Sequence, residues 1–148
     1  MELNIDRGLK TYEIKDADGT PVGTIRFNPA DPGLAGRWQE LVDELDRLST
    51  VDTTAMTAED TVALDRRIKE RMDYALGGQV SGVLFGGMSC LALCEDGTLV
   101  FENVLRALTP VLEAAQQKAM EATRQRMAQH TKAYADPAAG LAPGQSAE

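Results

Sequence analysis

Two cysteines and one histidine are the residues of this chain best suited to metal binding or nucleophilic catalysis. Cys90 and Cys94 lie four residues apart, so they form neither a C-x-x-C pair nor a disulfide framework. His130 lies in a polar stretch far along the chain, where a histidine is usually a surface residue. A zinc site would need both cysteines and added carboxylates. We therefore expect buried thiols, no metal site and no catalytic residue.

The segment ALGGQVSGVLFGGMSCLALC, residues 75–94, contains the glycines that a phosphate-binding loop would need. Gly82 and Gly87 have the outer spacing of a Walker A motif, but Met88 stands where that motif requires lysine. The segment is also too short and too interrupted by glycine to span a bilayer. The sequence therefore predicts neither a cofactor nor a membrane span here.

A packing role remains for these glycines. Gly78, Gly82 and Gly86 recur at intervals of four, a spacing that allows two backbones to approach closely. We expect Gly77 and Gly78 to end or bend the preceding helix, and Gly82 and Gly86 to permit close approach. Leu84 and Phe85 are expected to anchor the segment in the core.

Paired acids are the remaining candidates for acid–base catalysis. Asp43 and Glu44 fit a solvated helix face, whereas Glu95 and Asp96 fit a loop, and nothing marks either pair as an acid and a base. The charged run 65–71 is typical of a solvated face with pairing inside one helix. We therefore expect that the protein is not an enzyme.

Length and charge narrow the class of protein. The chain has 148 residues, about one domain, and a formal charge of −8, with thirteen acids against six bases in residues 1–60. No basic stripe with interleaved aromatic residues is present to overcome repulsion from phosphate, which disfavours nucleic-acid binding. The first ten residues lack the apolar core of a signal peptide. We expect a cytoplasmic protein that does not enter a membrane.

The chain is predicted to be α+β, mostly α. A β-hairpin is expected at about 9–28, because β-forming runs flank the turn sequence Asp16-Ala17-Asp18-Gly19. Amphipathic helices follow at about 31–48, begun by Asp31-Pro32, and at about 58–76, begun by a capping sequence at Thr57. A further helix is expected at about 98–109, so that residues 1–115 form one globular domain.

A long C-terminal helix is predicted at 111–134, rich in good helix formers. Its apolar stripe fades after Ala115, which favours a helix that projects or awaits a partner, with fast amide exchange from about that residue. The alternative is a peripheral helix packed on its own domain. Pro110 either kinks one helix or separates two. Residues 136–148 are expected to be a disordered tail.

The order of these motifs resembles a known family. The corner FNPADP at 27–32, the helix with Arg37 and Trp38, the segment MDYALGGQVSGVLFGGMS and the segment FENVLRALTPVLEAAQ follow one another in the chain. Over roughly residues 9–130 the chain resembles the small tail assembly chaperones of long-tailed phages and prophages of Gram-positive bacteria.

This resemblance implies a chaperone without catalysis that binds the tape measure protein, keeps it soluble and helps recruit tail tube protein. It also implies a chain absent from the mature virion, and homo-oligomers are possible. The acidic face of the first helix is a second candidate surface. Alternatives are a virion subunit, in tail completion or the head–tail connector, and a helical adaptor that oligomerises through 111–134. The candidate partner-binding residues are Leu112, Ala119, Met120 and Met127.

Overall fold

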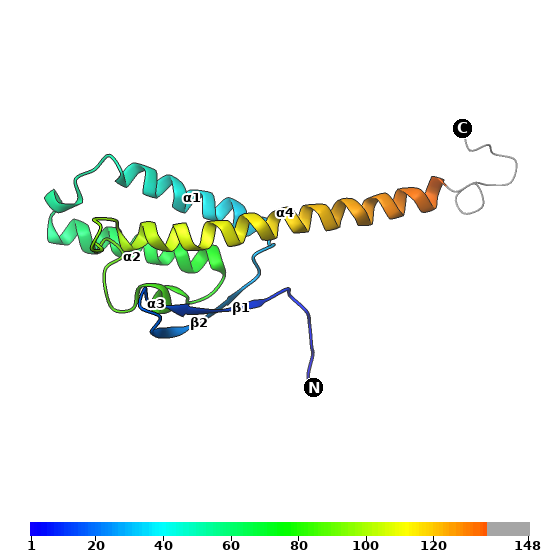
Figure 1. The fold of residues 1–148 in the computed structure, drawn as a ribbon, viewed down its shortest axis with the longest axis horizontal. Helices are drawn as coiled ribbons and strands as arrows, with labels where there is room; N and C mark the ends of the chain where they lie inside the picture. Colours follow the sequence, from blue (N-terminus) through cyan, green and yellow to red (C-terminus); the bar gives the residue numbers. More distant parts are fainter. Residues whose placement is uncertain (136–148) are drawn as a thin grey trace, which may run out of the picture.

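The computed structural model describes residues 1–135, with side chains as far as Lys132, so the predicted tail at 136–148 lies outside the described residues. It is α+β and mostly α, as the sequence predicted, with an N-terminal hairpin and a long C-terminal helix (Figure 1). The elements are β1 (Lys10–Lys15), β2 (Pro21–Phe27), α1 (Pro32–Leu48), a 3-10 turn η1 (Thr53–Ala55), α2 (Ala58–Leu76), α3 (Ser81–Phe85) and α4 (Val100–Ala135).

The hairpin covers the end of the core that contains α3. β1 and β2 pair antiparallel, with Tyr12 opposite Ile25, and the Asp16 N–H closes the turn on the Thr20 carbonyl oxygen at 2.8 Å. Ile25 and Phe27 of β2 are buried, and the Phe27 ring stacks on Tyr12 with their centres 4.8 Å apart. The predicted hairpin is therefore confirmed, and its inner face is completed by the helices.

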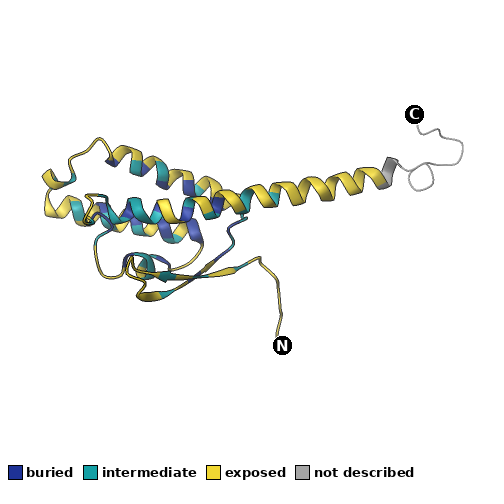
Figure 2. Ribbon diagram, viewed as in Figure 1, coloured by how far each residue is buried: buried dark blue, intermediate teal, exposed yellow. Residues whose placement is uncertain are grey.

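Helices α1 and α2 begin where the capping sequences predicted. The Asp31 carboxylate accepts a hydrogen bond from the Gly33 N–H at 2.9 Å, and the Thr57 hydroxyl accepts one from the Asp60 N–H at 3.1 Å. Leu41 of α1 and Ile68 of α2 are fully buried between the helices. Figure 2 shows this buried stripe on the inner faces of α1, α2 and the first half of α4.

The glycine segment follows the prediction in part. Gly77 ends α2 with φ +79°, a left-handed conformation that glycine adopts without a steric penalty. The short helix α3 then places Phe85 in the core, held by Asp73, whose carboxylate accepts hydrogen bonds from the Val80 and Ser81 N–H groups. The Asp73 side chain thus links the end of α2 to the start of α3.

The expectation that Gly82 and Gly86 permit close approach is wrong. Both are exposed, and a Cβ placed at either would meet no atom within 4 Å. Glycine is required at position 86 for its backbone conformation, because φ +61° and ψ −140° lie in a region that essentially only glycine adopts without strain. The glycines shape a turn and do not form a helix-packing face.

Of the two arrangements left open at Pro110, one helix or two, the structure shows one, so the ranges expected at about 98–109 and 111–134 join. Residues 100–135 form the single helix α4, with Pro110 inside it. Proline removes one backbone hydrogen bond, but side chains on both sides of it are anchored: Leu108 and Leu112 are buried. Thr109 accepts a hydrogen bond from the Trp38 indole N–H at 3.0 Å. Packing against α1 therefore maintains the helix through a residue that usually breaks one.

The expectation that Asp43 and Glu44 both lie on a solvated helix face is wrong for Glu44. Asp43 is exposed, but the side chain of Glu44 is only 3% exposed. It is paired with Arg47 of its own helix and with Arg67 and Arg71 of α2. Two bases of the charged run 65–71 thus reach across to α1 and do not pair only within α2.

Candidate interaction surface

The first half of α4 belongs to the core. Its apolar side chains recur at steps of four, three and four residues and are all less than a tenth exposed: Phe101, Leu105, Leu108 and Leu112. Leu112 was expected to contact a partner, but it is 4% exposed. Its side chain is therefore not available to a partner in this structure, because α4 uses it to pack on its own domain.

Gln116 is the anchor at which α4 leaves the domain. Its side-chain amide donates hydrogen bonds to the carbonyl oxygens of Pro29 and Asp31, at 3.0 and 2.8 Å. These two carbonyls lie in the corner between β2 and α1. No local pattern singles out Gln116, because its partners lie more than 80 residues earlier in the chain.

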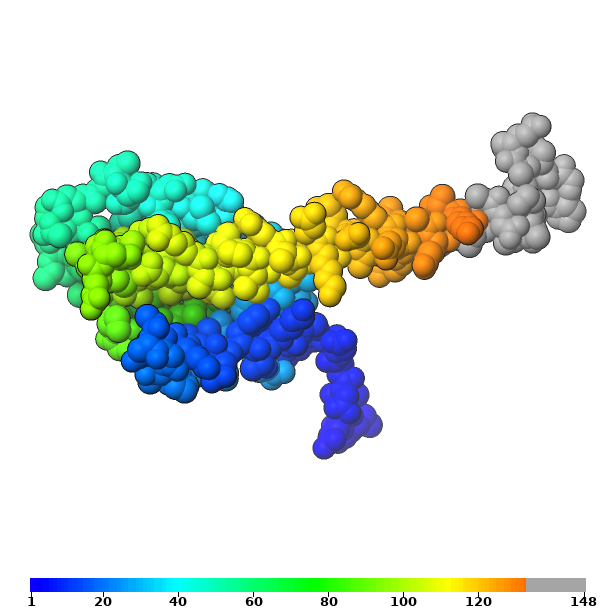
Figure 3. Space-filling model, in the orientation of Figure 1, coloured from blue at the N-terminus to red at the C-terminus, as the bar shows by residue number. Residues whose placement is uncertain are grey.

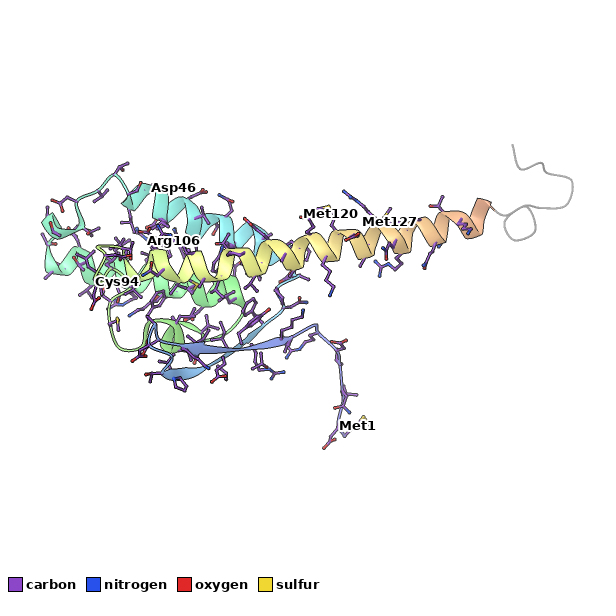
Figure 4. All side chains as sticks on the ribbon, viewed as in Figure 1. Met1, Asp46, Cys94, Arg106, Met120 and Met127 are labelled. Carbon is purple, nitrogen blue, oxygen red and sulfur yellow. The ribbon has the colours of Figure 1, made fainter. Side chains whose placement is uncertain are left out.

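Beyond this anchor the helix stands free of the domain, as Figures 1 and 2 show. Ala119 is half-buried, and every residue from Met120 to Lys132 is exposed. Met120 and Met127 are 54% and 63% exposed, and their spacing of seven residues puts them on one line along the helix (Figure 4). We call residues 117–132 the projecting segment.

The projecting segment and the rest of the chain carry opposite charges. Residues 117–132 contain four bases and one acid, whereas residues 1–116 contain eleven bases and twenty acids. Part of that acidic excess lies on the outer face of α1, where Glu40, Asp43 and Asp46 are exposed. The projecting segment is thus a basic helix with an exposed line of methionine, attached to an acidic domain.

The structure does not bring the cysteines and the histidine together. Cys90 is buried and its backbone contacts Phe101 at the start of α4, whereas His130 lies 29 residues further along that helix, about 40 Å away. Burial, reinforced by the Asp65 carboxylate, raises the pKa of the Cys90 thiol well above its ordinary value. A thiol in this state is a poor nucleophile. Cys94 is half-buried, and its sulfur accepts a hydrogen bond from the Asn103 amide.

A cleft of about 350 Å³ lies where α1 begins and α2 ends. The ionisable residues that line it are Arg7, Arg26, Arg37 and Asp31. The Arg37 guanidinium donates to the Ala75 carbonyl oxygen and pairs with Asp31 at 3.2 Å. Arg37 therefore stabilises the junction of the two helices, and three arginines are among the residues that line the cleft.

Within residues 1–135, no helix is long and apolar enough to cross a membrane. No cluster of three or more His, Cys, Asp or Glu side chains in that range is arranged to hold a metal ion. Comparison of the chain with models of protein families, with curated proteins and with solved structures found no match.

Amide exchange will locate the point at which α4 loses protection. We expect slow exchange up to Gln116 and fast exchange beyond Met120, because every side chain from Met120 to Lys132 is exposed. Gln116→Ala is expected to move the boundary back by about one turn, whereas Gln117→Ala, an exposed neighbour, leaves it in place. Hydrogen–deuterium exchange of the dilute protein measures this. Strong protection across 120–132 in a monomer would refute a projecting segment.

Proposed function

We propose that this chain is a tail assembly chaperone of a long-tailed phage or prophage. In this role it binds the tape measure protein, keeps it soluble and assists tail tube assembly, without catalysis. The observation that carries the proposal is the projecting segment, a helix that leaves its domain at Gln116 and exposes Met120 and Met127. The order of motifs along residues 9–130 supports the same family.

The chemistry of this segment suits a long helical client. Methionine side chains are flexible and polarisable, so they adapt to different apolar partners without a fixed pocket. A helix that offers one apolar line can pair with the apolar stripe of another helix. The surrounding lysines and arginines keep the unbound segment soluble and attract acidic clients. Met120, Met127 and the half-buried Ala119 are the proposed contacts, and Leu112 acts by supporting the helix.

Co-expression with a tape measure protein of the same phage or prophage tests the proposal. We expect the two proteins to co-purify and the tape measure protein to remain soluble only when the chaperone is present. Met120→Lys/Met127→Lys should weaken binding by about tenfold or more, because it removes both apolar contacts. The matched control is Gln125→Lys/Gln129→Lys, which adds the same charge on the opposite side of the helix and should bind normally. Equal loss in both variants, or no co-purification of the wild type, would contradict the proposal.

A second candidate role is that of a virion subunit or an oligomerising adaptor. The observation in its favour is the charge difference between the basic projecting segment and the acidic face of α1, which allows contact between copies. Mass spectrometry of purified particles separates the chaperone role from the virion-subunit role. A chaperone is expected to be absent from finished virions, whereas a constant number of copies per particle would establish the subunit role.

A further inference from the structure

Residues 1–7 form an extended arm with the residue pattern of a β-strand that has one covered face. Apolar Met1, Leu3 and Ile5 alternate with polar Glu2, Asn4 and Asp6. Leu3 and Ile5 are 78% and 73% exposed, so no described part of the chain covers the apolar side. Figures 1 and 3 show the arm leaving the hairpin and running away from the domain, with Met1 at its outer end in Figure 4.

The base of the arm has a defined geometry. The Asn28 side-chain amide donates a hydrogen bond to the Arg7 carbonyl oxygen at 3.0 Å, and the Gly8 N–H donates one to the Asp6 carboxylate at 2.8 Å. Gly8 has φ +68°, and a Cβ there would lie 2.7 Å from the Asn28 amide nitrogen. A turn at Gly8, held by these two hydrogen bonds, therefore directs the arm away from β1.

A free strand edge exists in the same molecule. Within residues 1–135, β1 pairs with β2 alone, so its outer edge has no strand partner. Tyr12 and Ile14 of β1 are only half-buried, whereas Ile25 and Phe27 of β2 are fully buried. Such an edge accepts another strand readily.

We propose that the arm of one copy of this chain adds as an antiparallel strand to the free edge of β1 in a second copy. The arm of the second copy adds in the same way to β1 of the first. The pairing that matches the apolar residues sets Leu3 opposite Ile14 and Ile5 opposite Tyr12. The arm then covers the two half-buried side chains of β1 with its own two exposed ones. This inference does not rest on the proposed function.

The charges of the arm select the same register and explain why the partner is a second copy. With Leu3 opposite Ile14, Glu2 falls beside Lys15, and neither acid of the arm faces Glu13. A shift of two residues in either direction sets Glu2 or Asp6 directly opposite Glu13, which is unfavourable. The β1 strand contains two lysines and one acid, so its charge complements that of the acidic arm.

Disulfide trapping between two variants, each with one added cysteine beside the buried Cys90, tests the pairing directly. A chain with Leu3→Cys is mixed with a chain with Ile14→Cys, both in a Cys94→Ser background, and oxidised. We expect a covalent dimer that contains one chain of each kind. The control pair, Leu3→Cys with Glu13→Cys, places the two thiols on opposite faces of the sheet and should yield at least about tenfold less dimer. Equal yields from both pairs would overturn the register.

Sedimentation of the full chain tests whether the arm drives association. We expect a concentration-dependent dimer whose dissociation constant rises about tenfold or more in Leu3→Ser/Ile5→Ser, because these side chains lose their apolar cover. Asn4→Ser, on the polar side of the arm, should dimerise as the wild type does. A wild type that stays monomeric, or a dimer that survives Leu3→Ser/Ile5→Ser, would overturn the proposal. So would a doubly substituted Leu3→Cys/Ile14→Cys chain that forms its disulfide as a monomer.

Discussion

Replacing Leu112 with alanine is expected to lower the free energy of unfolding by about 2–5 kcal/mol. The side chain is 4% exposed, and its removal would leave a cavity where α4 packs on the domain. Alanine is the best helix former, so the loss will reflect packing and not helix propensity. Urea denaturation followed by fluorescence of Trp38 measures the effect. That indole bonds to Thr109 on α4, so its signal also reports whether the helix stays docked.

The matched control for this experiment is Met127→Ala in the projecting segment. Met127 is 63% exposed, so its truncation should change the free energy of unfolding by no more than about 0.5 kcal/mol. The difference between the two losses of unfolding free energy distinguishes the docked half of α4 from the projecting half, because both substitutions introduce alanine into the same helix. Similar small effects at both positions would mean that α4 is not held at Leu112, and the anchor would then lie elsewhere.

Local sequence signals were sufficient to predict most of the fold. Asp31 and Thr57 begin their helices and Gly77 ends one, because each acts on backbone groups within a few residues of itself. The same holds for the hairpin, whose turn lies between two β-forming runs. Short α3 was not predicted, because its start depends on the Asp73 carboxylate at the end of the preceding helix.

The apolar pattern across Pro110 bears on one question that the sequence left open and on one error, the expected partner contact of Leu112. Leu105, Leu108 and Leu112 continue one stripe at steps of three and four across Pro110, and this continuity indicates a single packed helix. Given more weight, that stripe would have placed Leu112 in the core. Gln116 had no comparable signal, because its two acceptors are backbone carbonyls distant in sequence.

The pairing of Glu44 could not be predicted from the charge pattern of α1 alone, because Arg67 and Arg71 belong to α2. It lies three residues after Leu41 and four before Leu48, so its position is on the buried face of α1. The bases that neutralise it come mainly from α2, where Arg67 and Arg71 are four residues apart. Both signals were present in the sequence, but only the packing of α1 on α2 brings them together.

Glu44→Gln is expected to cost about 1–3 kcal/mol of unfolding free energy at neutral pH. The carboxylate is buried and accepts a 2.7 Å hydrogen bond from Arg67, with Arg71 at 3.5 Å, so the amide loses charge-assisted pairing on both sides. The cost stays moderate because the arginines are partly exposed and water can hydrate them. Asp43→Asn, the exposed neighbour, should change the unfolding free energy by no more than about 0.5 kcal/mol.

The pH dependence of the same variant gives the sharper test. Burial opposes ionisation of Glu44, but the hydrogen bond from Arg67 and the charges of Arg67, Arg47 and Arg71 outweigh it, so the pKa of the carboxyl lies below its ordinary value of 4.5. A lowered pKa in the folded state means that the stabilisation is complete above about pH 4.5 and is lost as the pH falls through the folded-state pKa. The difference in unfolding free energy between wild type and Glu44→Gln should therefore be constant from pH 7 to about pH 5 and shrink at lower pH. Other acids with lowered pKa values, Asp65 among them, are common to both proteins and cancel in the difference. A difference that does not shrink on acidification would show that Glu44 stabilises the fold by its shape and not by its charge.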